Sequence, residues 1–157
     1  MNLIDELRKL AKTLNQSNIE YALCDGLAMA AHGFVRATED ILIRHDDLEN
    51  TRSVVANCGF IILGGEIPLK PGTDDAGMIF RVSKVDGNQL LPLDIMLVTP
   101  AYESVWAERP TIQFEGMRIP VVSRAGMIRM KELGGRRKDL LDLEFLNGNP
   151  DAEPSEN

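Results

Sequence analysis

Cysteine, histidine and aromatic residues are scarce in this chain. Its 157 residues include two Cys and two His, and aromatic residues make up 5% of the sequence. Two isolated cysteines are too few for a disulfide framework or a structural zinc site, and neither a CxxC nor an HExxH spacing occurs. These absences exclude the small disulfide-stapled and zinc-finger classes. We expect Cys24 and Cys58 to be buried thiols.

Long apolar runs are also missing. No stretch approaches the roughly 20 apolar residues that a membrane-spanning helix needs. Residues 1–16 contain Asp5, Glu6, Arg8 and Lys9, which the apolar centre of a signal peptide would not tolerate. We therefore expect a cytoplasmic protein with no membrane partner.

Positive charge is in the minority. Lys and Arg number 17 against 24 Asp and Glu, so the net charge is −7. Binding of duplex DNA through the general surface is excluded, because such binding needs a basic face that displaces counterions. Residues 136–138 form the one dense basic cluster. They either start a solvated helix, paired with Asp139 and Asp142, or contact a nucleotide or RNA, and both interpretations stay open.

The remaining composition is that of a globular protein. Hydrophobic residues make up 44% of the chain, enough for one buried core. We expect a single domain over residues 1–146 and a disordered tail over 147–157, which is almost without apolar side chains. Hydrophobic periodicity and turn residues predict the following elements. Helices are expected at 2–15, 46–57, 100–106, 123–133 and 136–146, and strands at 19–23, 60–63, 78–85, 90–98, 111–114 and 117–122. The first helix has an apolar stripe of Leu3, Leu7, Leu10 and Leu14. We expect Asp46-Asp47 to cap the second helix and Ser123 to cap the fourth.

Residues 21–44 contain the most informative pattern. They indicate a strand, a tight turn at Asp25-Gly26, a short Ala-rich helix, a loop, and a second strand that begins at Asp40. A Gly turn that leads into a helix presents backbone N–H groups to an anion. A carboxylate at the start of the next strand can hold a divalent metal beside that anion. The pattern is therefore typical of a site that binds a nucleoside triphosphate with Mg²⁺.

A second carboxylate lies inside a predicted hairpin. Asp86-Gly87-Asn88 separates two apolar runs, and an Asp-Gly turn between such runs is a strong hairpin signal. The second run contains Asp94, where an unpaired carboxylate is costly. Before the hairpin, residues 64–77 are rich in Gly, Pro and Asp and show little periodicity, so we expect a mobile loop near the site.

These motifs, in this order, resemble the nucleotidyltransferase superfamily of DNA polymerase beta, and within it small bacterial enzymes related to abortive-infection toxins. The resemblance covers about residues 18–146 and includes His32-Gly33, the run from Arg36 to Ile41, the strand around Asp94, and a C-terminal segment with Lys131 and residues 136–142. It implies an α+β fold, in which a nucleotidyltransferase-like mixed β-sheet is flanked by α-helices.

The resemblance also implies a chemistry. In the family, an acceptor hydroxyl attacks the α-phosphate of a nucleoside triphosphate and pyrophosphate leaves, while carboxylates hold Mg²⁺ or Mn²⁺ at the site. The implied catalytic and metal-binding residues are Asp40 and Asp94. The implied nucleotide-binding residues are Asp25, Gly26, Arg36, Thr38 and Lys131. Arg36, Thr38 and Lys131 also have plain structural interpretations, as a surface arginine, a strand-entry threonine and a solvated lysine.

Two positions depart from the family pattern. The family metal motif is Asp-x-Asp, but Leu42 replaces the second carboxylate. The family turn is usually Gly-Gly or Gly-Ser, but here Asp25 occupies the first position. Asp25 either reaches the metal as a substitute ligand or caps the following helix, and its charge weakens triphosphate binding in both cases.

Two functions follow from these observations. The first is nucleotidyl transfer to a protein, an RNA or a small molecule, weakened by the missing carboxylate at position 42. The second is a catalytically inactive homologue that binds a nucleotide or a partner protein. Leu42 favours the second function, whereas Asp40, Asp94 and Lys131 favour the first.

Overall fold

The computed structural model describes residues 2–24, 39–134, 143–144 and 147. Its α-helices are α1 (Leu3–Gln16), α3 (Leu48–Ala56), α4 (Glu103–Ala107) and α5 (Arg124–Gly134), and its short 3-10 helices are η1 (His45–Asp47) and η2 (Pro100–Tyr102). Its strands are β1 (Tyr21–Cys24), β2 (Glu39–Ile43), β3 (Ile62–Leu69), β4 (Gly77–Asp86), β5 (Gln89–Leu97), β6 (Thr111–Phe114) and β7 (Met117–Pro120).

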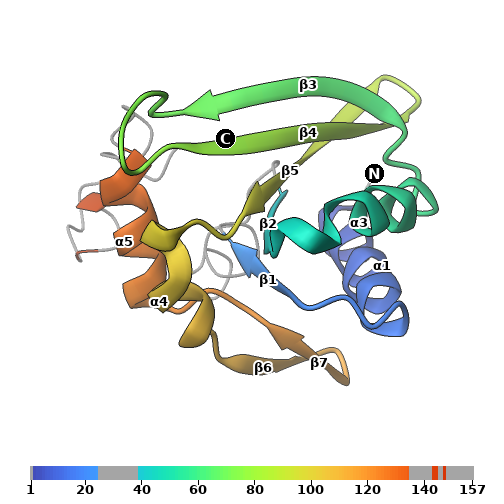
Figure 1. The fold of residues 1–157 in the computed structure, drawn as a ribbon. Coiled ribbons are helices and arrows are strands. Elements are labelled where there is room, and N and C mark those ends of the chain that lie inside the picture. Colours follow the sequence, from blue (N-terminus) through green and yellow to red (C-terminus); the bar gives the residue numbers. More distant parts are fainter. Residues whose placement is uncertain (1, 25–38, 135–142, 145–146, 148–157) are drawn as a thin grey trace.

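Five strands form one mixed sheet in the order β1-β2-β5-β4-β3 (Figure 1). β2 and β5 run parallel, and the other neighbouring pairs are antiparallel. β6 and β7 form a separate hairpin, which touches the main sheet where Leu23 of β1 bridges to Val121. The fold is therefore α+β, with a mixed sheet flanked by helices, as the sequence predicts.

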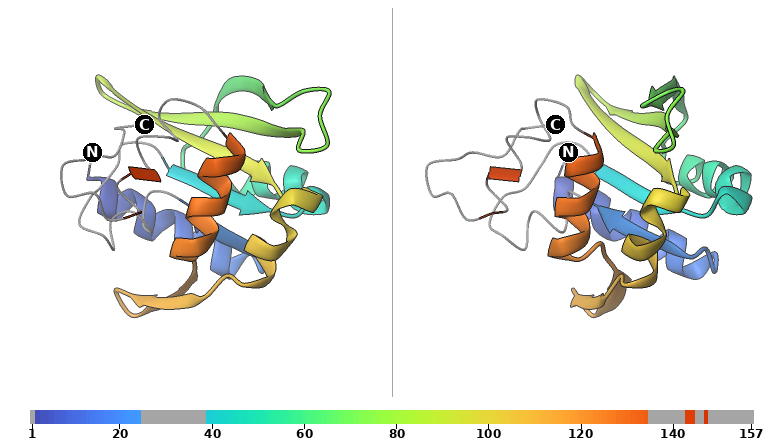
Figure 2. Two further views of the ribbon diagram at one scale, coloured as in Figure 1. Left: turned by 90° about the vertical axis from the view of Figure 1, so that its left-hand side faces the viewer. Right: turned by 60° about the vertical axis from the view of Figure 1, so that its left-hand side comes forward.

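Helices cover both faces of this sheet (Figure 2). On one side, called here the α1/α3 face, the helices α1 and α3 pack on a cluster that includes Leu23, Ile41 and Leu93. On the other side, called the α4/α5 face, the helices α4 and α5 pack on a cluster that includes Leu42 and Met96. Ile41 and Leu42 thus point to opposite faces, as neighbours on a strand must.

The hairpin of β4 and β5 follows from its turn residues. Gly87 has a positive φ of 60°, which glycine adopts at little cost, and Asp86 pairs directly with Gln89 across the turn. The structure confirms the predicted hairpin. It is also the longest paired segment of the sheet, so the side chains on its two strands are held in a fixed register.

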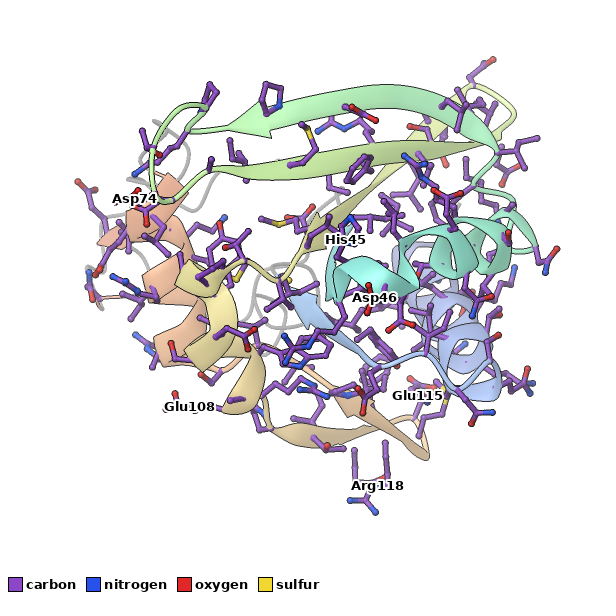
Figure 3. All side chains as sticks on the ribbon, viewed as in Figure 1. His45, Asp46, Asp74, Glu108, Glu115 and Arg118 are labelled. Carbon is purple, nitrogen blue, oxygen red and sulfur yellow. The ribbon has the colours of Figure 1, made fainter. Side chains whose placement is uncertain are left out.

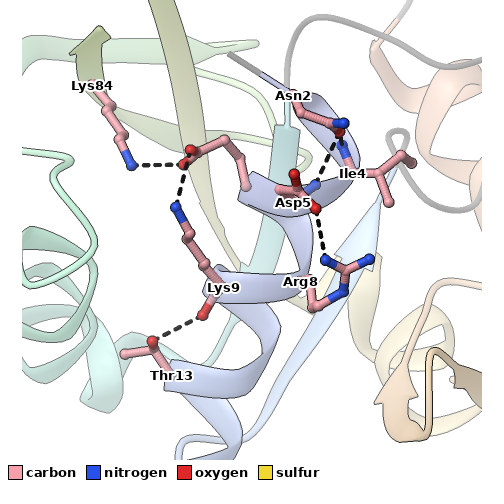
Figure 4. A network of polar contacts seen from close by, with 8 residues as sticks. Asn2, Ile4, Asp5, Arg8, Lys9, Thr13 and Lys84 are labelled. Carbon is pink, nitrogen blue, oxygen red and sulfur yellow. Dashed lines mark hydrogen bonds and ion pairs between the residues drawn. The ribbon is translucent and has the colours of Figure 1, made fainter.

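Helix α1 is joined to the sheet through polar contacts (Figure 4). Asn2 caps the helix, because its side-chain oxygen accepts hydrogen bonds from the N–H groups of Ile4 and Asp5. Glu6, which is buried, accepts a hydrogen bond of 2.7 Å from Nζ of Lys84 on β4. Three leucines of the predicted stripe have described side chains, and all three are buried between α1 and the sheet. They are Leu7, Leu10 and Leu14.

Three local predictions are wrong. The segment after Gly64 is not a loop as far as position 77, because β3 extends to Leu69 and pairs with β4, and only residues 70–76 form turns. β-Sheet pairing has overridden the Gly- and Pro-rich local sequence. Asp47 precedes α3 without a side-chain capping bond. Cys58 is only partly buried, whereas Cys24 is buried as expected.

Several predictions lie outside the described residues. They include the turn at Asp25-Gly26 with the Ala-rich helix after it, the basic cluster 136–138 and most of the helix expected at 136–146. Of the tail, only position 147 is described. In the part of the chain that is described, no helix is both long enough and apolar enough to cross a lipid bilayer.

Candidate functional site

Three charged side chains lie in one row across the sheet. Asp40 on β2 is the direct partner of Asp94 on β5, and Asp94 is the direct partner of Arg81 on β4. Directly paired residues on neighbouring strands point to the same face. The row continues to Cys24 on β1, which pairs with Asp40. All four side chains belong to the α4/α5 face, because Cys24 is part of its apolar cluster.

The two carboxylates are close together and shielded from water. Asp40 is 8% exposed and Asp94 is 4% exposed. Neighbouring strands lie about 4.8 Å apart, so two such carboxylates repel each other unless a positive charge is near. Asp40 and Asp94 thus come from neighbouring strands and share a face of the sheet. Their pairing depends on the parallel contact of β2 with β5.

Arg81 supplies a positive charge to this pair. Its Nε donates to Oδ1 of Asp94 at 2.7 Å, and its Nη2 donates to Oδ2 of the same carboxylate at 3.0 Å. Two parallel N–H···O bonds of this kind are the strongest geometry for an arginine–carboxylate pair. The hydrogen bonds to Asp94 are the main reason that the pKa of Arg81 is raised, and the charge of Asp40 raises it further.

The sequence contains a signal for Arg81 that lies outside the recognised motifs. The Asp86-Gly87-Asn88 turn fixes which residues of the hairpin are opposite each other. Counting outward equally from this turn, the residue opposite Asp94 is Arg81. Arg81 lies between the apolar residues Phe80 and Val82, so it is predictable as the ion-pair partner of Asp94.

Position 42 is part of the apolar core. Leu42 is fully buried in the cluster that joins the sheet to α4 and α5, together with Met96 and Trp106. It lies on the same face as Asp40, as expected for a residue two positions further along a strand. The side chain of Leu42 thus fills space beneath the helices.

Lys131 lies on the side of α5 that faces the sheet. It is 5% exposed, and it follows Met127 by one helical turn. Met127 and Met130 pack in the cluster that contains Leu42. Lys131 is therefore not the solvated lysine of the plain structural interpretation. The carboxylate row and this lysine belong to the same layer of the molecule.

The other predicted site residues lie outside the described part of the chain. These residues are Asp25, Gly26, Arg36 and Thr38, so their positions relative to Asp40 and Asp94 stay a prediction. Among the residues that the structure describes, no group of three or more His, Cys, Asp or Glu side chains is arranged to hold a metal ion.

A hollow of about 370 Å³ lies where α3, β3 and β4 meet. It is lined by Arg52, Leu63, Gly65, Glu66, Phe80, Arg81 and Val82. Neither carboxylate of the row contributes to it. In the wall of the hollow, the guanidinium of Arg52 lies 4.7 Å from the ring centre of Phe80, which is a cation–π contact.

The sequence matches no protein-family profile and no curated protein sequence. Two solved structures resemble the fold, namely JHP933 from Helicobacter pylori and a Helicobacter pylori protein named provisionally as a nucleotidyltransferase. Each is 20% identical over 93% of this chain, with a TM-score of 0.46. This chain spans 65% of the length of the first and 67% of the second. Such a distant likeness says nothing of the reaction.

Proposed function

We propose that this chain is a nucleotidyltransferase-fold protein that transfers a nucleoside monophosphate from a nucleoside triphosphate to an acceptor. The acceptor in this proposal is a protein, an RNA or a small molecule. The observation that supports this proposal most is the direct pairing of Asp40 with Asp94 on parallel strands. The missing carboxylate at position 42 makes the transfer slow.

The donor set fits one divalent ion. Carboxylate oxygens are the ligands that Mg²⁺ and Mn²⁺ take, and Asp40 with Asp94 offers two neighbouring carboxylates. A second ion would need a third carboxylate, which the described residues do not provide. A metal ion bound to this pair would neutralise negative charge on the reacting phosphate. Asp25, which lies outside the described residues, is the remaining candidate ligand.

The proposed nucleotide site surrounds this pair. Lys131 would act on phosphate as a point charge from the helix that covers the same face of the sheet. In the proposal, the turn at Asp25-Gly26 receives the triphosphate on its backbone N–H groups, and Arg36 and Thr38 line the approach to Asp40. Each metal ligand lost costs several kcal/mol of transition-state stabilisation, and ~1.4 kcal/mol is tenfold in rate.

The second candidate function is a catalytically inactive module that binds a nucleotide or a partner protein. Two observations favour it. Leu42 is fully buried as a core residue, and both oxygens of the Asp94 carboxylate accept hydrogen bonds from Arg81. In this alternative, the residues of the former metal site serve to hold the sheet together.

Label transfer separates the two functions. The full chain is incubated with α-³²P-labelled nucleoside triphosphates, Mn²⁺ and candidate acceptors. We expect slow incorporation of label that Asp40→Asn abolishes, because this change removes one charge from the metal site but keeps the shape of the side chain. Asp86→Asn, at the exposed turn of the hairpin, is the matched control and should keep full activity.

Two results would overturn the transfer proposal. One is the same rate of incorporation by the native chain and by Asp40→Asn. The other is no incorporation with any triphosphate while nucleotide binding remains, which would establish the inactive module.

A further inference from the structure

The Asp94 carboxylate is already bound to a cation of the protein itself. Both of its oxygens accept N–H bonds from Arg81, in the two-pronged geometry that a guanidinium forms with carboxylate. Asp94 is almost completely buried, whereas the side chain of Arg81 is 39% exposed. A divalent ion that binds Asp94 must therefore displace Arg81 or share the carboxylate with a positive charge at very short range.

Electrostatics make these two partners competitors. Asp40 and Asp94 together carry two negative charges on one face of the sheet, and Arg81 neutralises one of them. Like charges a few ångströms apart repel strongly where water is excluded. Arg81 also interacts with the charge of Asp40, which contributes to its raised pKa. The guanidinium thus reduces the attraction of the whole carboxylate pair for a second cation.

We infer that Arg81 is a built-in competitor of the divalent metal: its guanidinium occupies Asp94 and keeps the affinity of the Asp40–Asp94 pair for free metal low. The inference concerns the same site as the proposed function and rests on it for the identity of the metal. It assigns to Arg81, a residue outside the family motif, control over the affinity of this site for the metal.

The backbone opposite Arg81 is adapted to hold this side chain in place. β3 has an irregular register between Leu63 and Gly65, so Gly64 lies at a β-bulge. A Cβ atom added at Gly64 would approach Cγ of Arg81 to 2.7 Å and its Cβ to 3.0 Å. Only glycine leaves room at this position for the stem of Arg81. Gly64 is therefore a positioning residue for the guanidinium.

Mn²⁺ titration followed by electron paramagnetic resonance tests the inference without any reaction. The native chain, Arg81→Gln and Arg81→Lys are compared at equal ionic strength. We expect Arg81→Gln to bind Mn²⁺ about tenfold more tightly than the native chain, which corresponds to ~1.4 kcal/mol. Arg81→Lys should be intermediate, because lysine keeps the charge but not the two-pronged geometry.

The matched control is Arg118→Gln. Arg118 projects from β7 at the bottom of the molecule (Figure 3) and is exposed, whereas Arg81 belongs to β4 at the top (Figure 1). The change Arg118→Gln removes the same charge from the chain as Arg81→Gln, so it should leave Mn²⁺ affinity unchanged. In a background of Asp94→Asn, the change Arg81→Gln should bring a much smaller gain, because the carboxylate that Arg81 occupies is gone and only its longer-range effect on Asp40 remains.

Folding is checked separately. Removal of Arg81 leaves Asp94 buried without its main partner, which is destabilising, so the circular dichroism of each variant is recorded before titration. If Arg81→Gln does not fold, Arg81→Lys and Gly64→Ala replace it. Gly64→Ala keeps every charge and only shifts the stem of Arg81, and it should raise Mn²⁺ affinity severalfold.

The outcomes distinguish the inference from the proposed function. Equal Mn²⁺ affinity in the native chain and in the folded variants at positions 81 and 64 would overturn the role of Arg81. Tighter Mn²⁺ binding by these variants, without label transfer by any of them, would support the role of Arg81 and reject nucleotidyl transfer.

Discussion

At the residue scale, position 42 shows how two side chains on one face of a strand can have different surroundings. Leu42 and Asp40 share one face of β2, but only Asp40 lies in the charged row. Leu42 packs in the apolar layer under α4 and α5, where it is completely buried. A carboxylate introduced at position 42 would therefore be placed among apolar side chains.

This arrangement predicts that Leu42→Asp destabilises the protein. Burying a charge without a partner, together with the loss of apolar packing, should cost about 4 kcal/mol in the free energy of unfolding. Leu42→Met keeps the volume and should cost less than about 1.5 kcal/mol. Urea denaturation followed by circular dichroism measures both. A Leu42→Asp variant as stable as the native chain would mean that water or a cation reaches this position.

At the scale of elements, the packing of α5 depends on a glycine in its first turn. The N–H of Gly126 donates to Oγ of Ser123, which caps the helix as the sequence predicts, and the residue is buried. A Cβ atom at Gly126 would come within 2.8 Å of Val122 and 3.1 Å of Val105 in α4. This glycine therefore sets how closely α5 approaches α4 and the sheet.

Gly126→Ala should destabilise the protein, although alanine favours helices. The gain in helix propensity is about 1 kcal/mol, but overpacking typically costs about 1–3 kcal/mol, so we expect a net loss of about 1 kcal/mol. Ser53→Ala, at an exposed position of α3, is the control and should change the free energy of unfolding by less than about 0.5 kcal/mol. A net stabilisation by Gly126→Ala would show that α5 can move away from α4.

At the scale of the whole molecule, stability towards alkali depends on a phenol in the core under α1. Tyr21 is 1% exposed, and its hydroxyl donates to Asn15 at 2.9 Å. Burial raises the pKa of Tyr21 above its ordinary value. Above pH ~10, where an unfolded tyrosine loses its proton, the folded chain therefore keeps a proton that the unfolded chain has lost.

The burial of the Tyr21 hydroxyl makes stability depend on pH. Its contribution to the free energy of unfolding is complete below pH ~10 and is lost as the pH rises above that value. We expect the difference in unfolding free energy between the native chain and Tyr21→Phe to shift in favour of Tyr21→Phe between pH 9 and pH 11. Urea denaturation of both proteins across this range measures the shift. A constant difference would mean that the phenol ionises equally in both states.

The sequence by itself determined the elements that depend on neighbouring residues. The leucine spacing of α1, the turn at Gly87 and the cap at Ser123 each act within a few residues, so local patterns predicted them. The same patterns identified Asp40 and Asp94 as carboxylates on strands. The prediction failed after Gly64, where pairing with β4 outweighed the local preference for turns.

The tertiary structure decided which side chains from separate segments meet. The parallel contact of β2 with β5 brings Asp40 beside Asp94, and packing of α4 and α5 turns position 42 into core. The hairpin turn already sets Arg81 opposite Asp94, but only the pairing of β3 with β4 brings Gly64 against the stem of Arg81. The contacts between separate segments form because buried charges need partners and apolar faces need cover, conditions that local sequence does not encode.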